Sequence, residues 1–382
     1  MLETRLGEPT DRKALSRRLA ALGLNGDPWA GGRLGEVYLM LTMGCNLRCR
    51  ACSLWGEGGA CHDRAYLRQT SKLAPLPRLL AFLDEVAARG ARQVTLTGGE
   101  PLLSRRWEPL ARRLKALGLK AALTTNGTLL ERHASDVAGL FDQVNVSVAT
   151  PPELRGELRT GPPGHWESMI AGLRALAALR RRSGGRPKLR LLCEVFDANA
   201  GSLERVIEGL EQEGACFDEV YIQHLIFNRP ETLREQERVL DAEFGLKAGL
   251  WRGYGYAPRR MDFPAFDAAL SGVRRRWPQA VFSVDLRGEA ALRTYYEGDR
   301  RAMGRPWCDG PWSQVNVLPN GSVWTCPDVI LGSLAERGFD EIWDGEPARA
   351  LRRRVSKRLL PACRGCFYFY GDGHFPRRLH DA

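Results

Sequence analysis

Short apolar runs alternate with longer amphipathic stretches along the first two thirds of the chain. Six runs predict buried strands, at Val37–Thr42, Val94–Thr97, Ala121–Thr125, Val144–Val148, Leu189–Phe196 and Val220–Ile226. Stretches with helical periodicity stand between them, at Leu76–Arg89, Trp107–Leu117, Trp166–Arg182 and Leu203–Glu213. Nearly continuous apolar strands that alternate with helices are typical of βα units around a parallel sheet. The pattern therefore predicts an α/β fold with a partial (β/α)6 barrel.

The composition divides the chain into four segments. Residues 1–34 are expected to form a leader segment with one helix, and residues 35–228 the partial barrel. Residues 229–300 are polar and rich in aromatic side chains, and we expect an irregular linker or insertion there. Residues 301–382 contain four cysteines, a Pro-Asn-Gly turn and a glycine-rich tail, which predicts a small C-terminal α+β domain.

Cysteine usage and charge narrow the class of protein. Ten cysteines in 382 residues are too few for a disulfide scaffold, and seven of them stand in two groups, which favours metal or cluster ligation. The absence of a long apolar run or a signal-like N-terminus predicts a cytoplasmic protein with no membrane partner. The net charge of +11 comes mostly from arginine runs on predicted helices, without interleaved aromatics. We therefore expect solvated helix faces and no nucleic-acid partner.

The most informative motif is MGCNLRCRAC, which spaces Cys45, Cys49 and Cys52 as C-x3-C-x2-C. Three thiolates can hold three irons of a [4Fe–4S] cluster and leave the fourth iron open to a small molecule. A zinc ion is the alternative, but it needs a fourth ligand, which Cys61 or His62 would have to bring. The motif favours a cluster with chemistry at its open iron.

A second motif, Gly98-Gly99-Glu100-Pro101, directly follows the second predicted strand. Active-site residues of such barrels gather at the carboxyl ends of strands. The two glycines let the backbone approach a ligand closely, and Glu100 can accept hydrogen bonds from an ammonium group. An ordinary turn between a strand and a loop is the alternative for this short motif.

The cysteine triad, followed by GGEP about 45 residues later, resembles the signature of radical S-adenosylmethionine (SAM) enzymes. The resemblance implies that SAM chelates the open iron and that GGEP binds its methionyl amine. It implies cofactor-binding positions at Ala51, Gly98, Gly99, Glu100, Pro101, Thr125, Asn126, Ser147 and Arg159. Ala51 departs from the family pattern, which has a large residue there, so Leu54 and Trp55 are alternatives for the adenine contact.

The second cysteine group consists of Cys308, Cys326, Cys363 and Cys366. The turn Pro319-Asn320-Gly321 predicts a hairpin that holds cysteines at its two ends. Four thiolates suit a [4Fe–4S] cluster or a zinc ion equally well. After a radical SAM barrel, the spacing C-x17-C…C-x2-C resembles the twitch domain, the short form of the SPASM domain. That resemblance implies a second, fully ligated auxiliary [4Fe–4S] cluster.

Three residues on the last two predicted strands are candidates for catalysis. Cys193 and Glu194 are consecutive and must face opposite sides of the sheet, and we expect Glu194 to face the barrel interior. Cys193 could donate a hydrogen atom to a radical, although a free cysteine is more often a small buried hydrophobe. His224 is a further candidate facing inward, and a core histidine bonded to a backbone carbonyl is its alternative.

The resemblance implies a radical SAM oxidoreductase that forms a 5′-deoxyadenosyl radical and removes a substrate hydrogen atom. A fully ligated second cluster favours net oxidation, by dehydrogenation or crosslinking. The implied partners are a small-molecule or peptide substrate and an electron donor of the flavodoxin or ferredoxin type. The short segment before the first strand favours a small molecule. The alternatives are a redox-neutral epimerase or mutase and a zinc-ribbon-like nucleic-acid-binding protein.

Overall fold

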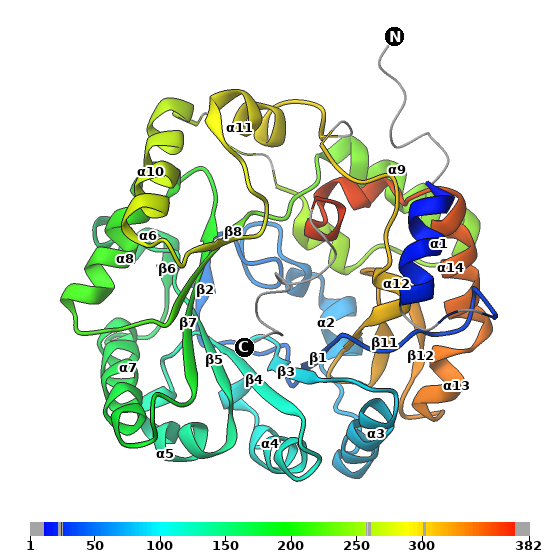
Figure 1. Ribbon diagram of the computed structural model, residues 1–382, viewed down its shortest axis with the longest axis horizontal. Coiled ribbons are helices and arrows are strands. Elements are labelled where there is room, and N and C mark those ends of the chain that lie inside the picture. Colours follow the sequence, from blue (N-terminus) through cyan, green and yellow to red (C-terminus); the bar gives the residue numbers. More distant parts are fainter. Residues whose placement is uncertain are drawn as a thin grey trace.

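A single curved sheet of ten strands organises the protein. The computed structural model describes residues 11–21, 24, 26–256, 258, 261–300 and 303–370. The strand order is β12-β11-β10-β1-β3-β4-β5-β7-β8-β9. Figure 1 shows the helices α3, α4, α5, α7 and α8 on the outside of this curved row of strands.

The predicted parallel barrel forms the central part of the sheet. Its strands are β1 Glu36–Met40, β3 Gln93–Thr97, β4 Lys120–Thr125, β5 Gln143–Ser147, β7 Lys188–Val195 and β8 Glu219–His224. Each is parallel to its neighbours in this part of the sheet. The prediction of an α/β fold with a partial (β/α)6 barrel is confirmed.

Amphipathic helices cover the outer face of the barrel. They are α3 Leu76–Ala88, α4 Trp107–Ala116, α5 Leu130–Leu140, α7 His165–Arg182 and α8 Leu203–Gln212. In α8 the buried positions include Leu203, Val206, Ile207 and Leu210, a spacing that places them on one face of a helix. The four predicted helices are confirmed to within a few residues, whereas α5 was not predicted.

The expectation of irregular structure over residues 229–300 is wrong. This segment contains α9 Pro230–Phe244, η5 Leu250–Tyr254, α10 Phe263–Arg276, β9 Val281–Phe282 and α11 Gly288–Tyr296. Strand β9 extends the sheet beside β8. The aromatic side chains of this segment fill a core instead of standing in an irregular insertion. Phe263, Phe266, Tyr295 and Tyr296 are all buried. Tertiary packing stabilises these helices despite their weak periodicity.

The C-terminal segment continues the sheet on the other side of β1. Its strands are β10 Gln314–Val317, β11 Ser322–Trp324 and β12 Ile330–Ser333, and its helices are α12 Gly310–Ser313, α13 Phe339–Trp343 and α14 Glu346–Lys357. Strand β10 is parallel to β1, whereas β11 is antiparallel to β10, so the predicted hairpin is confirmed. Cys326 follows its second strand, but α12 separates Cys308 from its first strand, so cysteines do not stand at both ends. One sheet therefore supports both cysteine groups.

The remaining elements are short. They are α1 Arg12–Ala21, α2 Arg64–Thr70, α6 Arg155–Leu158, β2 Arg48–Cys49, β6 Arg159–Thr160, η1 Ala60–His62, η2 Pro101–Leu103, η3 Pro152–Leu154, η4 Ala200–Ser202, η7 Pro361–Gly365 and η8 Phe367–Phe369. The expected helix of the leader segment is α1. Among the residues that the structure describes, no helix combines the length and the apolar character needed to span a membrane.

The arginine runs are only partly solvated helix faces. Arg276 pairs with Glu208, and Arg180 pairs with Asp218. Arg352 is fully buried and donates to three backbone carbonyl groups, including those of Pro311 and Trp343. The expectation of solvation is wrong for Arg352, because these carbonyls replace water around its guanidinium.

Candidate active site

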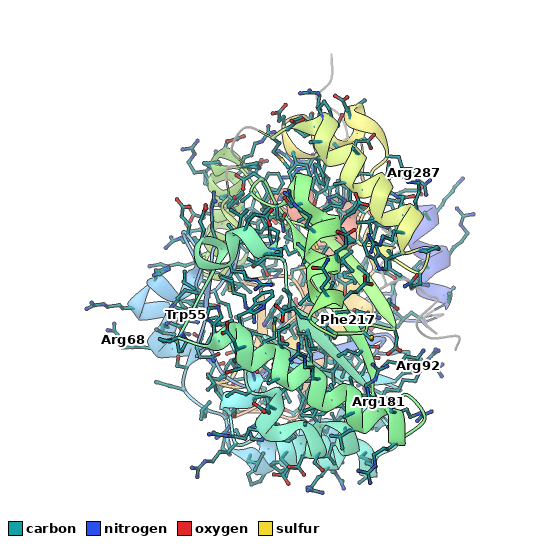
Figure 2. All side chains as sticks on the ribbon, turned by 90° about the vertical axis from the view of Figure 1, so that its left-hand side faces the viewer. Trp55, Arg68, Arg92, Arg181, Phe217 and Arg287 are labelled. Atoms are coloured by element: carbon teal, nitrogen blue, oxygen red, sulfur yellow. The ribbon has the colours of Figure 1, made fainter. Side chains whose placement is uncertain are left out.

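The cysteine triad lies at the edge of the barrel where the strands end. In Figure 2, Trp55 of the cysteine loop lies on one side of the molecule, and Arg92 and Phe217 lie toward the other side. Arg92 and Phe217 precede β3 and β8, respectively. The triad is therefore at the carboxyl edge of the sheet, where the active sites of βα barrels form.

Gly98 and Gly99 let the end of β3 pack against the backbone that leads into Cys45. The N–H of Gly99 donates to the carbonyl of Thr42 across 2.7 Å. A Cβ atom on Gly99 would lie 2.1 Å from the carbonyl oxygen of Gly44, and Gly98 has a φ of 136°. Only glycine tolerates such a φ at position 98 and such a close backbone at position 99. The two glycines therefore let β3 approach the backbone of the cysteine loop, whereas the sequence analysis expected them to let a ligand approach.

Glu100 is completely buried and binds groups of its own chain. Its carboxylate accepts hydrogen bonds from the Thr125 hydroxyl at 2.8 Å, the Asn126 N–H at 2.7 Å and the Leu102 N–H at 3.1 Å. Burial raises the pKa of Glu100, while the hydrogen bonds from Asn126 and Leu102 lower it. The carboxylate joins the ends of β3 and β4, and Pro101 begins the turn η2 directly after it.

Arg159 continues this network to β5. Its guanidinium donates to the carbonyl of Ser147 across 2.7 Å and to the carbonyl of Asn126. Arg159 is opposite Cys49 in the short β2–β6 ladder. Burial lowers the pKa of Arg159, whereas the nearby Cys49 thiolate and Glu100 raise it. Its Nε is buried and has no hydrogen-bond partner among the described residues.

A cavity of about 130 Å³ lies against this network. Five residues of its lining were predicted from the sequence, namely Cys49, Ala51, Ser147, Arg159 and Glu194. The lining also includes seven residues that were not predicted, Val148, Ala149, Thr150, Leu158, Leu192, Phe196 and Gln223. The alternatives Leu54 and Trp55 do not belong to it: Leu54 is buried in a smaller core, and the Trp55 indole donates to the Met43 carbonyl.

Glu194 faces the cavity, as predicted, and Cys193 faces the buried core behind the sheet. Burial raises the pKa of Glu194 to about 7, and a hydrogen bond from Gln223 opposes this shift. Gln223 is the residue directly opposite Glu194 on β8 and lines the same cavity. The sequence analysis missed Gln223, although the alternation along β8 would have identified it once the register was known.

The inward orientation considered for His224 is wrong. His224 is opposite Val195 and therefore faces away from Glu194 and Gln223. Its Nδ1 lies 3.0 Å from the Tyr296 hydroxyl, and its ring packs near Phe266. The alternative was a core histidine that hydrogen-bonds a backbone carbonyl. It is also wrong for Nδ1, because Nδ1 bonds the Tyr296 hydroxyl. Burial lowers the pKa of His224 to about 3.

The surroundings of the triad do not suit zinc. His62 donates to the Gly56 carbonyl at 3.1 Å if Nε2 carries the proton, and Cys61 is buried in the smaller core. Zinc ligands would have to meet within ~2.3 Å of one point, whereas cluster thiolates bind separate irons.

The fold brings the other four cysteines together from distant parts of the sequence. Cys308 precedes α12, Cys326 follows β11, and Cys363 and Cys366 belong to the turn around η7. Burial raises the pKa of Cys326, and the neighbouring thiolates of Cys363 and Cys366 raise it further. All four are partly buried free thiols, which fits a cluster held in a protected site.

Comparisons with known proteins identify both parts. The Radical SAM superfamily matches residues 39–186, and the SPASM iron-sulfur cluster-binding domain matches residues 308–367. This chain belongs to the radical SAM superfamily. Its C-terminal segment is a SPASM domain, and the cofactors of such a protein are SAM and [4Fe–4S] clusters.

Sequence relatives of this radical SAM protein include biosynthetic enzymes. A pre-heme d1 synthase of Dinoroseobacter shibae is 27% identical over 86% of this chain and 78% of its own length. A probable GTP 3′,8-cyclase of Methanosarcina acetivorans is 35% identical over 38% of this chain. The matched region spans 42% of that cyclase.

Solved structures share the fold at low sequence identity. Native anSMEcpe with bound AdoMet has a TM-score of 0.54 at 16% identity, over 90% of this chain and 98% of its own. SuiB of Streptococcus suis bound to its precursor peptide SuiA has a TM-score of 0.53 at 13% identity, over 92% of this chain and 74% of its own.

The site fits these cofactors. Cys45, Cys49 and Cys52 would hold the SAM-binding cluster, and the second cysteine group the auxiliary cluster. The unpartnered Nε of Arg159, which lines the cavity beside Cys49, is available to a carboxylate such as that of SAM.

Proposed function

We propose that this radical SAM protein oxidises a small biosynthetic substrate, by dehydrogenation or by crosslinking. Cys45, Cys49 and Cys52 would hold the SAM-binding cluster, and Cys308, Cys326, Cys363 and Cys366 the auxiliary one. When bound, SAM and the first cluster would supply radical chemistry for removal of a substrate hydrogen atom, and the second cluster would supply an acceptor for one further electron. The protein binds and orients the substrate and excludes water. Glu194 and Gln223 are the polar groups proposed to contact it on the β7 and β8 side of the cavity.

The observation that carries this proposal is the position of the turn η5 between the two cysteine groups. The N–H groups of Leu250 and Trp251 donate to Asp328, which follows Cys326 by two residues, across 2.7 and 2.9 Å. On the other side, a Cβ atom on Gly253 would lie 1.9 Å from the carbonyl oxygen of Ser53, the residue after Cys52. A single turn thus contacts both cysteine-bearing loops.

Tyr254 ends this turn close to both groups. Burial raises the pKa of Tyr254 to about 12, and Glu194 and the thiolates of Cys366 and Cys52 raise it too. Tyr254 packs against the main core, as Cys363 and Cys366 do, and against the smaller core, as Cys52 does. We therefore propose that a substrate in the Glu194 cavity would lie near both clusters. This proximity favours electron uptake by the auxiliary cluster, and hence oxidation over a redox-neutral outcome.

The class of substrate is inferred from the relatives. Those reported above are named for GTP and for a haem precursor, which favours a small molecule. SuiB was solved with a precursor peptide, so a peptide is the second candidate. The ten cysteines form no disulfide, which is consistent with a proposed cytoplasmic location. We also propose an electron donor of the flavodoxin or ferredoxin type. We also propose the division into a barrel over 35–228 and an auxiliary-cluster domain over 301–382.

The test compares two activities in one variant. Anaerobically reconstituted protein receives SAM, dithionite and a small-molecule extract, and 5′-deoxyadenosine and products lighter by two hydrogens are measured by mass spectrometry. The double variant Cys363→Ala, Cys366→Ala should still cleave SAM, because its cysteine triad is intact. Its oxidised product should fall sharply, because the substrate radical has lost its electron acceptor.

Three controls make the result decisive. Circular dichroism, iron content and SAM binding exclude unfolding of the variant, since loss of a cluster can unfold the region that holds it. A folded variant that forms the lighter product at the wild-type rate would exclude the auxiliary cluster as the electron acceptor. A wild-type product of unchanged mass would instead support a redox-neutral epimerase or mutase. Wild-type protein that binds iron but never cleaves SAM would contradict the proposed chemistry altogether.

A further inference from the structure

A second cavity, of about 210 Å³, shares no lining residue with the cavity at Glu194. Helix α2 contributes Tyr66 to its lining, the start of η5 contributes Leu250, and strand β11 contributes Trp324. The cavity is therefore built from the barrel, from the segment after it and from the SPASM domain. The chemistry proposed above assigns no role to it.

Two residues of this lining each carry a buried hydrogen-bond donor that has no partner among the described residues. The Nε1 of Trp324 is buried and unpartnered among the described residues, and the Trp324 side chain is only 8% exposed. The Tyr66 hydroxyl is likewise buried and unpartnered. Buried polar groups in native proteins are almost always satisfied, so a bound group with acceptor oxygens is expected beside them.

Asp328 supplies an acceptor in the same lining. Its carboxylate accepts from the N–H groups of Gly249, Leu250 and Trp251. An ionised carboxylate has about four acceptor positions, so capacity for another donor remains. Asp328 also has a φ of 66°, the only positive value outside glycine among the described residues. Such conformations persist where the surroundings impose them, often at ligand sites.

The rest of the lining is mixed, since aliphatic side chains stand beside the polar residues Gln69, Thr70, Asn320 and Ser322. Leu250, Leu318 and Ile330 provide aliphatic surface, and Lys247 adds an exposed ammonium group. An apolar cavity of about 150 Å³ can hold a benzene molecule, so this cavity has room for a ligand the size of a single amino acid.

We propose that this cavity binds a small zwitterion of the α-amino-acid class with an aliphatic side chain. Its carboxylate accepts hydrogen bonds from Tyr66 and Trp324, and its ammonium group donates to Asp328. Its side chain packs against Leu250 and Leu318. Both leucines belong to the smaller core that also contains Cys61, so the ligand adjoins the core beneath the cysteine loop. The inference is independent of the reaction proposed above.

The experiment is equilibrium dialysis of the anaerobically reconstituted protein with radiolabelled L-leucine. Saturating SAM is present, because the amino and carboxylate groups of leucine could otherwise chelate the open iron. Saturable binding of about one leucine per chain is expected. Competition by 4-methylpentanoate, which lacks the ammonium group, and by 3-methylbutylamine, which lacks the carboxylate, should each be at least about tenfold weaker than by unlabelled leucine.

Three variants locate the site. Tyr66→Phe and Trp324→Phe each remove one donor and keep an aromatic ring, and each should weaken leucine binding about tenfold. Lys188→Gln removes an exposed charge at the start of β7 and should leave leucine binding unchanged. Tyr66→Phe removes a single hydroxyl, so it keeps the test decisive even where Trp324→Phe fails to fold.

Several results would overturn the proposal. Leucine that binds only in the absence of SAM would be occupying the open iron. Wild-type affinity in a folded Tyr66→Phe variant would place leucine elsewhere, and 4-methylpentanoate binding as tightly as leucine would remove the role of Asp328. The absence of any saturable binding would leave the cavity to water.

Discussion

The hydroxyl of Thr125 donates a hydrogen bond to the carboxylate of Glu100 across 2.8 Å, with both groups buried. The other carboxylate oxygen of Glu100 accepts from the N–H of Asn126, whose carbonyl in turn accepts from Arg159. The loop after β3 is thereby tied to the end of β4 and to a residue that lines the cavity. We therefore expect Glu100 to act on the site through Asn126 and Arg159, as a positioning residue.

We predict that Glu100→Ala weakens SAM binding by roughly ten- to a hundredfold and leaves both clusters assembled. The substitution leaves the buried donors of Leu102, Thr125 and Asn126 unpaired, which should also lower the free energy of unfolding by about 2–4 kcal/mol. Equilibrium dialysis with SAM and urea unfolding measure the two effects. Thr125→Val removes one donor and should give a smaller change in each. Unchanged SAM affinity in Glu100→Ala would exclude Glu100 from the network that shapes the site.

The iron content should follow the two cysteine groups separately. Reconstituted wild-type protein is expected to carry about eight irons per chain, as two cubane clusters. Replacement of Cys45, Cys49 and Cys52 together by Ala should leave about four irons, because the four-cysteine site is built from other elements. Iron and acid-labile sulfide analysis provides the measurement. Complete loss of iron in the triple variant, or zinc in the wild type, would contradict the assignment.

Arg159→Lys should weaken SAM binding by about tenfold while the iron content stays the same. Lysine keeps the positive charge, but its ammonium lacks the planar fork that contacts the carbonyls of Ser147 and Asn126 and the Nε that is free for a carboxylate. Arg155→Lys is the matched control, because Arg155 stacks on Trp166 at 3.9 Å and does not line the cavity. Equal losses in the two variants would point to a general loss of positive charge.

His224 should make the protein less stable as the pH falls. Its pKa is lowered from 6.5 to about 3 by burial and by Arg274, so below pH 6.5 the unfolded chain binds a proton that the folded protein excludes. The contribution of His224 to the free energy of unfolding should therefore be about 1.4 kcal/mol lower at pH 5.5 than at pH 7.5. Urea unfolding at both pH values, in wild type and in His224→Gln, isolates this group. An equal pH dependence in the two proteins would show that His224 is not the cause.

Much of the barrel and of the cysteine chemistry was predictable from local sequence. Apolar strands buried on both faces produce continuous runs, so all six barrel strands were identified within a few residues of their ends. The cysteine spacings and the GGEP motif stand at the carboxyl ends of strands, and parallel strands bring such ends to one edge. Of the five predicted residues that line the cavity, Cys49 and Glu194 followed from spacing and strand alternation, whereas Ala51, Ser147 and Arg159 were implied by the family resemblance.

Tertiary structure alone decided the rest. Whether His224 or Gln223 faces the cavity depends on the register of β8 against β7, and a shift of one residue would exchange them. Residues 229–300 appeared irregular because their helices depend on packing between aromatic side chains far apart in the chain. The second cavity was not predictable either, because its residues Tyr66, Trp324 and Asp328 come from separate segments that share no motif. The sequence by itself determined which groups can bind iron and where strands begin and end, because those depend on residue type and local period. Which groups meet across the sheet was decided by the tertiary structure, because pairing between distant segments has no local signature.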